Sequence, residues 1–293
     1  MTLPDVLNPL SKIAGLLFIV PTLLVMGLSL TVAQIIQPLR NARLVTLALL
    51  ANFVLVPFLA YLILRVIPLE QSLRIGLVVL ATAAGAPFLP KLVQDAKGDT
   101  AFSVALTVLL MVVTIMVMPI VLPLLIPGAQ VRAWDIAWPL IVLMLIPLSL
   151  GMLIKFRAPG AATRWPPVLN RISTIALLVY VVIGLGLNIS NIRSLIGTGG
   201  ILALLLFIIG TMLIGFLLGG RDPRMRSVMG LGTAQRNVAT AILVTAQNFS
   251  TGNTVSYVLV GAIILLIILL PTARLIGARQ VAAAKSQGTG SAD

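Results

Sequence analysis

The sequence predicts an all-α integral membrane protein with nine transmembrane helices. Hydrophobic residues make up 59% of the 293 positions and charged residues only 9%. A soluble domain of this length needs a charged surface, which so few charged residues cannot provide. Several apolar runs reach the roughly 20 residues that a helix needs to cross a bilayer. Backbone polar groups in lipid must be satisfied within a segment, so these runs are expected to be helices.

The nine expected spans follow one another with short connections. Their approximate boundaries are 13–36, 41–65, 71–94, 100–127, 135–155, 168–190, 198–219, 225–247 and 253–278. The first is expected to be a retained helix, because Lys12 is too little basic sequence for a processed signal peptide. From about residue 282 the small and polar sequence AAAKSQGTGSAD is typical of a disordered tail.

The net charge of +13 is distributed unevenly over the connections. One set is strongly basic and contains Arg40, Arg43, Lys155, Arg157, Arg164, Arg171, Arg221, Arg224, Arg226, Arg274, Arg279 and Lys285. The opposite set carries only the isolated cations Lys12, Arg65, Arg74, Arg132 and Arg193. The positive-inside rule therefore predicts an N-terminus outside and a C-terminus in the cytoplasm of a cell membrane. The basic loops are interpreted as topology signals rather than as nucleic-acid contacts.

The missing residue types exclude several kinds of chemistry. The chain has no cysteine and no histidine, and only seven acidic residues. This excludes disulfides, thiolate metal sites and His-based catalytic arrangements, and it disfavours a carboxylate metal cluster. We therefore expect neither an enzyme nor a bound metal or cofactor.

A short pattern recurs between the third and the eighth span. Gly76-Leu77 matches Gly230-Leu231, and Gly98-Asp99-Thr100 matches Gly252-Asn253-Thr254, both at an offset of 154 residues. The eighth span comes five spans after the third, an odd number, so the two copies run in opposite directions through the membrane. The pattern predicts an inverted-topology repeat, which is typical of secondary transporters.

The two halves of this repeat are unequal in length. The first would hold four spans, about 13–127, and the second five, about 135–278. The whole chain is expected to form a single transporter domain.

The third and eighth spans are also predicted to be broken. The third contains Gly85, Pro87 and Pro90, and a proline inside a helix removes a donor and clashes with the preceding turn. The eighth contains the consecutive polar residues Gln235, Arg236 and Asn237. Paired broken helices in corresponding positions are the best sequence indication of a transporter binding site.

Arg236 is the main candidate for function, because a cation within a span is costly and usually faces protein or a water-filled cavity. It is interpreted as an anion ligand or a fixed charge in the translocation path. The alternative is a structural arginine that donates to backbone carbonyls exposed at the helix break. Gln235 and Asn237 would supply amide groups to the same site, or else join helices by hydrogen bonds.

Five further polar residues lie near the first break. Lys91 is either part of the site or a snorkelling interface residue, and Asp95, four positions later, is its expected partner. Asp99 is expected to cap the fourth span. Ser103 and Thr107 share a face of that span and by themselves are expected only to bond local carbonyls.

The order of motifs resembles the bile acid:sodium symporter superfamily in its bacterial and plastid branches. The matching stretches are MGLSLT at 26–31, NFVLVP at 52–57, the region of Gly85, AKGDTAFSVALT at 96–107 and GTAQRNVATAILVTAQNF at 232–249. The resemblance implies a core domain and a panel domain, with two broken helices crossing beside the substrate cavity. It also implies that Asn52, Ser103 and Thr107 lie at positions of sodium ligands.

Two other sodium-ligand positions of the family differ here. Leu89-Pro90 replaces an expected Ser-Asn pair, and Leu231-Gly232 stands where the family has a glutamate that serves both ions. We therefore expect transport that does not need sodium. Arg236 and Lys91 would then replace the ion by hydrogen-bonding the freed carbonyls, which would make the protein a uniporter, an exchanger or a proton-linked carrier.

The function predicted best is secondary-active transport of a small organic anion, attracted by Arg236 and by the positive ends of half-helices. An arsenite or antimonite efflux carrier is the first alternative, although such carriers are expected to have a cysteine in the first broken helix and this chain has none. A non-transporting membrane protein of the same fold is the second alternative. A channel is favoured least, because paired breaks suit alternating access better.

Overall fold

The computed structural model describes residues 3–126, 132–187, 189, 195–249 and 253–289, and the regular elements within these ranges are all helical. Seven helices of this part are long and apolar enough to cross a membrane. They are α1 (Leu3–Ser29), α3–η2–α4 (Ala42–Leu50, Ala51–Leu55, Val56–Val66), α7 (Thr100–Leu125), α8–η3–α9 (Ala133–Leu140, Ile141–Leu145, Ile146–Arg157), α11 (Pro166–Leu187), α13 (Gly200–Leu218) and α16 (Thr254–Thr289).

The two spans that were predicted to be broken are broken. The first is divided into α5 (Gln71–Thr82) and α6 (Leu89–Asp95), and the second into α14 (Pro223–Ala234) and α15 (Val238–Asn248). None of these four helices is long enough to span a bilayer alone, which requires about 20 residues. Nine crossings and an inverted repeat stay predictions, because they require each pair to act as one span.

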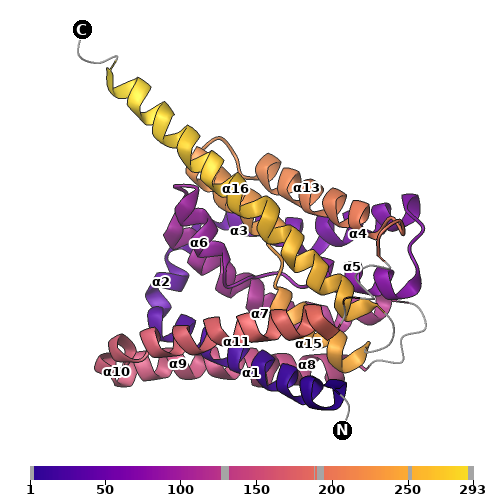
Figure 1. Cartoon of the computed structure of the whole chain (residues 1–293). Coiled ribbons are helices and arrows are strands. Elements are labelled where there is room, and N and C mark those ends of the chain that lie inside the picture. Colours follow the sequence, from indigo (N-terminus) through magenta and orange to yellow (C-terminus); the bar gives the residue numbers. More distant parts are fainter. Residues whose placement is uncertain (1–2, 127–131, 188, 190–194, 250–252, 290–293) are drawn as a thin grey trace.

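The helices form two layers. In Figure 1, α1, α8, α9, α11 and the short α10 (Pro159–Arg164) lie together, and the remaining helices lie above them. Helix α1 packs mainly against α9 and α11. Glycines allow this approach: a Cβ atom on Gly27 would lie 2.2 Å from the Leu148 carbonyl oxygen and 2.9 Å from the Gly151 Cα. Small residues at such contacts are the common way for membrane helices to pack closely.

The first predicted span ends earlier than expected. It was placed at 13–36, whereas α1 ends at Ser29 and a separate helix α2 (Val32–Ile36) follows, then η1 (Pro38–Arg40). Thr31 starts α2 through a capping box, in which its side chain accepts from Gln34 N and Gln34 Oε1 accepts from Thr31 N. The sequence stays apolar across this boundary, so hydropathy alone does not reveal the cap.

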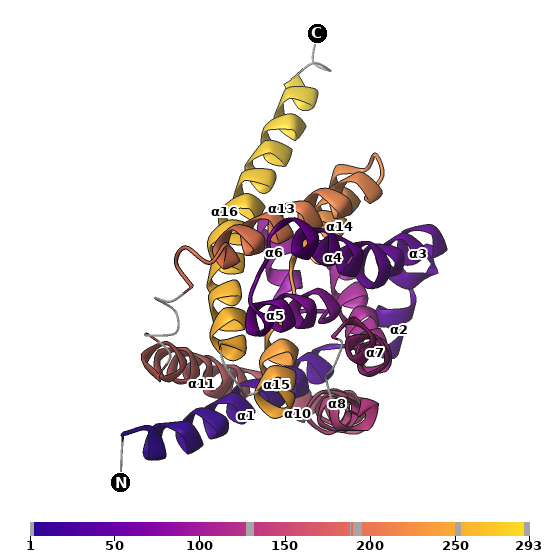
Figure 2. The ribbon, with the colours of Figure 1, turned by 90° about the vertical axis from the view of Figure 1, so that its right-hand side faces the viewer.

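The last helix continues beyond its predicted end. Helix α16 reaches Thr289, although a disordered tail was expected from about residue 282, and residues 290–293 lie outside the described part. The alanine-rich sequence here favours a helix. Gln280 Nε2 donates to Ser227 Oγ at 2.8 Å and so attaches α16 to α14. Figures 1 and 2 both show the C-terminal end of α16 projecting beyond the other helices.

Candidate functional site: the crossing of two helix breaks

The first break follows Thr82, and its shape depends on Gly85. Gly85 has φ +78°, a conformation that costs a residue with a Cβ atom about 1–2 kcal/mol. A Cβ atom there would also lie 2.3 Å from Met111 N of α7. Pro87 lies within the break, whereas Pro90 falls in the first turn of α6, where proline is tolerated because no donor is lost. The break was thus predicted correctly, but Pro90 begins the second half-helix rather than breaking the first.

The second break contacts the first directly through Asn237. Its backbone N donates to Ala83 O and its Nδ2 donates to Gly85 O, both at 2.9 Å. Its Oδ1 accepts from Thr240 N at 3.1 Å and thereby caps α15. Asn237 is 1% exposed, so these bonds are shielded from water. The two breaks therefore cross in contact, with Asn237 as the joint.

Arg236 makes a second connection between the breaks. The residue is 0% exposed. Its Nε donates to Leu80 O at 3.0 Å and its Nη2 donates to Ala81 O at 3.0 Å, both in the last turn of α5. Its Nη1 donates to Thr233 O at 3.1 Å, in the last turn of α14. Helix ends leave their last carbonyls short of intrahelical partners, and this guanidinium donates to three of them, of which Leu80 O also accepts from Ala83 N at 3.3 Å.

The fourth acceptor of Arg236 is Asn52, whose Oδ1 lies 2.8 Å from Nη1. Asn52 belongs to the widened helical segment η2, where Val56 N donates to Ala51 O, five residues earlier. Pro57 explains this widening, because it has no N–H to donate to Phe53 O. Asn52 Nδ2 donates to Ala48 O at 3.0 Å, so the amide is fixed at both ends. The oxygen that the family resemblance assigned to an ion therefore accepts from Arg236.

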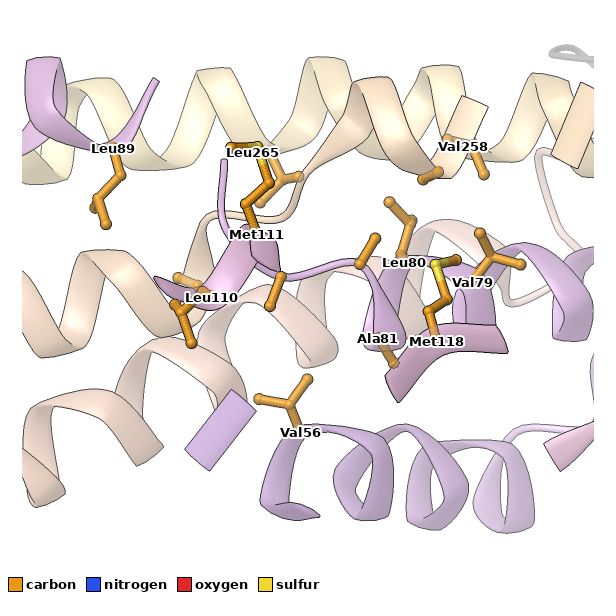
Figure 3. Packing of buried hydrophobic residues seen from close by; sticks show 14 of the residues in the cluster. Val56, Val79, Leu80, Ala81, Leu89, Leu110, Met111, Met118, Val258 and Leu265 are labelled. Carbon is orange, nitrogen blue, oxygen red and sulfur yellow. The ribbon is translucent and has the colours of Figure 1, made fainter. Parts of the chain in front are cut away.

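Leu80 and Ala81 of α5, whose carbonyls accept from Arg236, have apolar side chains. Figure 3 shows Val79, Leu80 and Ala81 at the end of α5 close to Met118 of α7.

Within the described part of the chain, the single ion pair is Lys91 Nζ to Asp95 Oδ1 at 2.9 Å. Asp99 caps α7 as predicted, by accepting from Phe102 N at 2.8 Å. Neither acid pairs with Arg236, so its charge is balanced by dipoles.

The remaining predicted residues are not brought to the crossing as ligands. Lys91 is 57% exposed and bonds Asp95, so its ammonium does not reach a freed carbonyl. Ser103 Oγ donates to Thr100 O at 2.7 Å, and Thr107 Oγ1 donates to Ser103 O at 2.8 Å, as the local interpretation expected. Both hydroxyls are buried within α7.

A cavity of about 590 Å³ lies between the two layers beside the crossing. Helices α1 and α11 line one side, and α15, α16 and both breaks line the other, mostly with apolar side chains. Gln235 and Asn237 are among its few polar wall residues. Arg236 also belongs to this wall, but it is 0% exposed and so lies behind its neighbours. In Figure 2, α15 lies below α5, at the height of α11 in the other layer.

Gln235 is the polar group of this wall that lacks full pairing. The residue is 6% exposed, and its Oε1 is buried without a hydrogen-bond partner. Such an atom is uncommon in a folded protein and needs an explanation, for example a ligand or water at the site. Among the predicted residues, Gln235 is therefore the one best placed to meet a substrate.

A second cavity, of about 540 Å³, lies near the other end of α1. It is lined by polar residues of the connection between α1 and α3 and by the start of α7, including Ser29, Gln34, Asn41 and Thr100. No pattern in the sequence indicates this cavity, because its lining residues come from separate connections.

The sequence also did not indicate Thr114, although it lies at the first break. Thr114 Oγ1 accepts from Ala84 N at 3.2 Å and donates to Ala84 O at 3.1 Å, so it satisfies both backbone groups of one residue in the break. A lone threonine in an apolar helix usually bonds its own backbone, so no sequence pattern marks this role.

One comparison with known proteins identifies a family for the chain. The model of the sodium bile acid symporter family matches residues 16–195, which is more than half of the chain. A comparison with curated proteins finds no match. The matched range includes the first break and four of the five stretches that carried the resemblance, and it ends before the second break. With its apolar helices and the two crossing breaks, the chain is a multi-pass membrane protein that belongs to the sodium bile acid symporter family.

Proposed function

We propose that the protein is a secondary-active carrier of a small organic anion with an apolar body. The family supports membrane transport of the bile acid symporter type. The observation that supports the substrate class is the mostly apolar cavity, which meets the buried amide of Gln235 at the crossing. An apolar body would lie against α1, α11 and α16, and the charged group would lie at the crossing. The size of the cavity is within the usual range for small-molecule sites.

Two features of the crossing favour an anion. Helix α15 begins at Val238, so its positive end faces this cavity, and a helix N-terminus carries roughly half a positive charge. The side chain of Gln235 also lies in this wall, and its NH2 group can donate two hydrogen bonds to a carboxylate.

Alternating access between the two cavities is the proposed mechanism. One cavity lies beside the crossing, and the other lies at the C-terminal end of α1, beside α2, η1 and the start of α7. In this mechanism a core domain and a panel domain, built on an inverted repeat, would move relative to each other. This movement would expose the crossing to each side of the membrane in turn. The loop charges support an N-terminus outside and a cytoplasmic C-terminus in a cell membrane. The hydrogen bond from Arg236 to Asn52 supports a carrier that does not use sodium at this position.

Uptake into proteoliposomes tests this proposal. Purified protein would be offered apolar carboxylates, each paired with its neutral amide analogue, and uptake would be measured in vesicles with and without protein. Accumulation or exchange of carboxylates, but not of amides, is expected. The variant Gln235→Leu should lose at least tenfold of this uptake while keeping its thermal stability, because leucine has a similar size and removes only the polar group. Equal uptake by vesicles with and without protein, or a fully active Gln235→Leu variant, would contradict the proposal.

A further inference from the structure

The acceptors around Arg236 form a closed set, here called the oxygen cage: Leu80 O, Ala81 O, Thr233 O and Asn52 Oδ1. All four atoms lie 2.8–3.1 Å from a guanidinium nitrogen. Three are backbone carbonyls and one is a side-chain amide oxygen, and none is a carboxylate. They come from three separate segments, α5, α14 and η2. Neutral oxygens that converge from different elements on one buried charge form a site for a cation.

The charge of the cage matches a single positive charge. The carbonyls belong to the last turns of α5 and α14, both of which are 12 residues long. Each helix C-terminus carries roughly half a negative charge, so the two ends together supply about one. The Arg236 side chain brings one positive charge to the point where the two ends meet. This explains how a fully buried arginine is accommodated without an acidic partner in the described part of the chain.

We propose that the Arg236 guanidinium is a tethered cation that permanently fills a monovalent-cation site made by the ends of the two broken helices. The site then needs no mobile ion, and the junction of the breaks keeps its charge at every stage of the working cycle. Without the side chain, the same cage would bind a free cation of matching size and shape. Free guanidinium should fit best, because it has the same planar set of N–H donors from which the four oxygens now accept hydrogen bonds in Arg236.

The crossing has a second joint, which makes this proposal testable. Asn237 connects the breaks through Ala83 and Gly85 independently of Arg236. Removal of the Arg236 side chain should therefore weaken the junction without separating the two breaks. The expected result is a folded protein with reduced stability and an empty cage.

The experiment is chemical rescue of Arg236→Ala. The apparent Tm of the purified variant in detergent would be measured with guanidinium chloride and, separately, with tetramethylammonium chloride at the same concentration. About 10 mM is suitable, because it is roughly a hundredfold below the molar concentrations at which guanidinium unfolds proteins. The matched control is Arg226→Ala, since Arg226 Nε also donates to a helix carbonyl, Phe216 O at 3.2 Å, but on an exposed side chain.

We expect Arg236→Ala to have a lower Tm than the wild type and guanidinium to restore most of the loss. Tetramethylammonium should have no effect, because it is too large and donates no hydrogen bond. The wild type and Arg226→Ala should respond to neither salt. The measurement needs no substrate, so its failure would not bear on the proposed transport function.

Three results would overturn the proposal. The first is a variant as stable as the wild type, which would mean that the cage needs no cation. The second is a destabilised variant that both salts stabilise equally or that neither stabilises. The third result applies if the variant cannot be recovered from membranes in ordinary buffers, in which case the extraction would be repeated with about 10 mM guanidinium throughout. Failure to recover the variant under these conditions would overturn the proposal. Recovery only when guanidinium is present would support it.

Discussion

Arg236 Nη1 donates to Asn52 Oδ1 at 2.8 Å, across 184 positions of sequence. This bond joins the break between α14 and α15 to the widened segment η2, and both residues are fully buried. A hydrogen bond to a charged group is worth about 1.5–3 kcal/mol, more than a neutral one, and this bond is shielded from water. The pair thus connects a second-span helix to the crossing.

Replacement of Asn52 should destabilise the protein. Asn52→Ala removes an acceptor from a buried charge and should lower the free energy of unfolding by about 2–3 kcal/mol, since the guanidinium is left with an unpaired donor. The matched control is Asn248→Ala, because Asn248 Nδ2 donates to Val244 O at 3.0 Å, in the same local pattern as Asn52 Nδ2 to Ala48 O. Apparent Tm values of both purified variants decide the matter. Equal losses in the two variants would show that the bond to Arg236 contributes nothing.

The shape of the first break predicts that Gly85→Ala is strongly destabilising. Its positive φ alone costs alanine about 1–2 kcal/mol, and the close approach to Met111 N adds a steric clash. Gly220→Ala separates the two effects, because Gly220 also has φ +78° but a Cβ atom added there would meet no atom within 4 Å. Gly85→Ala should therefore lower the apparent Tm clearly more than Gly220→Ala does. Decreases of similar size would mean that α7 moves away from residue 85 without a cost in free energy.

The breaks were predictable from the sequence because their causes are local. Pro87 and the polar residues 235–237 interrupt apolar runs, and the structure has breaks at both places. The capping box at Thr31 also has a local pattern, but it lies within a continuous apolar stretch, where the helix boundary is not visible in hydropathy. Local chemistry therefore predicted the positions of most elements.

The partners of Arg236 could not be predicted in the same way. Two of its acceptors are the carbonyls of Leu80 and Ala81, and the side chains of these residues give no sign of a polar role. Arg236 was interpreted as an anion ligand or a fixed charge in the translocation path, and in the structure its guanidinium donates to the backbone of α5 and α14. Its structural alternative described the contacts better. Only the three-dimensional arrangement brings the two helix ends together.

The charge of the connections predicts the orientation in the membrane. Reporter fusions placed before Thr2 and after Ser286 should be found on opposite sides, the first outside and the second in the cytoplasm, because the basic connections stay on the cytoplasmic side. Two reporters at each end, one active only in the cytoplasm and one active only outside it, give independent measurements. Activity of both ends on the same side would contradict the orientation and would also require an even number of crossings.

The last prediction concerns sodium. Substrate binding should not depend on this ion, because the side-chain oxygen of Asn52 accepts from Arg236 and the sequence has no acid in the second broken span. A ligand that binds only the folded protein raises its apparent stability, by about 2.7 kcal/mol at a concentration of 100 Kd. An organic anion that produces such a shift should produce the same shift in sodium, potassium and choline chloride.

The three salts must be compared at one ionic strength, since screening changes the attraction of an anion to a positive site. Asn52→Asp provides a sharper comparison, because the added carboxylate would form a salt bridge with Arg236 and reduce the positive field at the crossing. Anion binding to this variant should weaken equally in all three salts. A shift that occurs in sodium only, in the wild type, would show that the ion binds elsewhere in the protein and is coupled to the substrate. Weaker binding of Asn52→Asp in potassium and choline, but not in sodium, would also contradict the prediction, and it would place a sodium ion near residue 52.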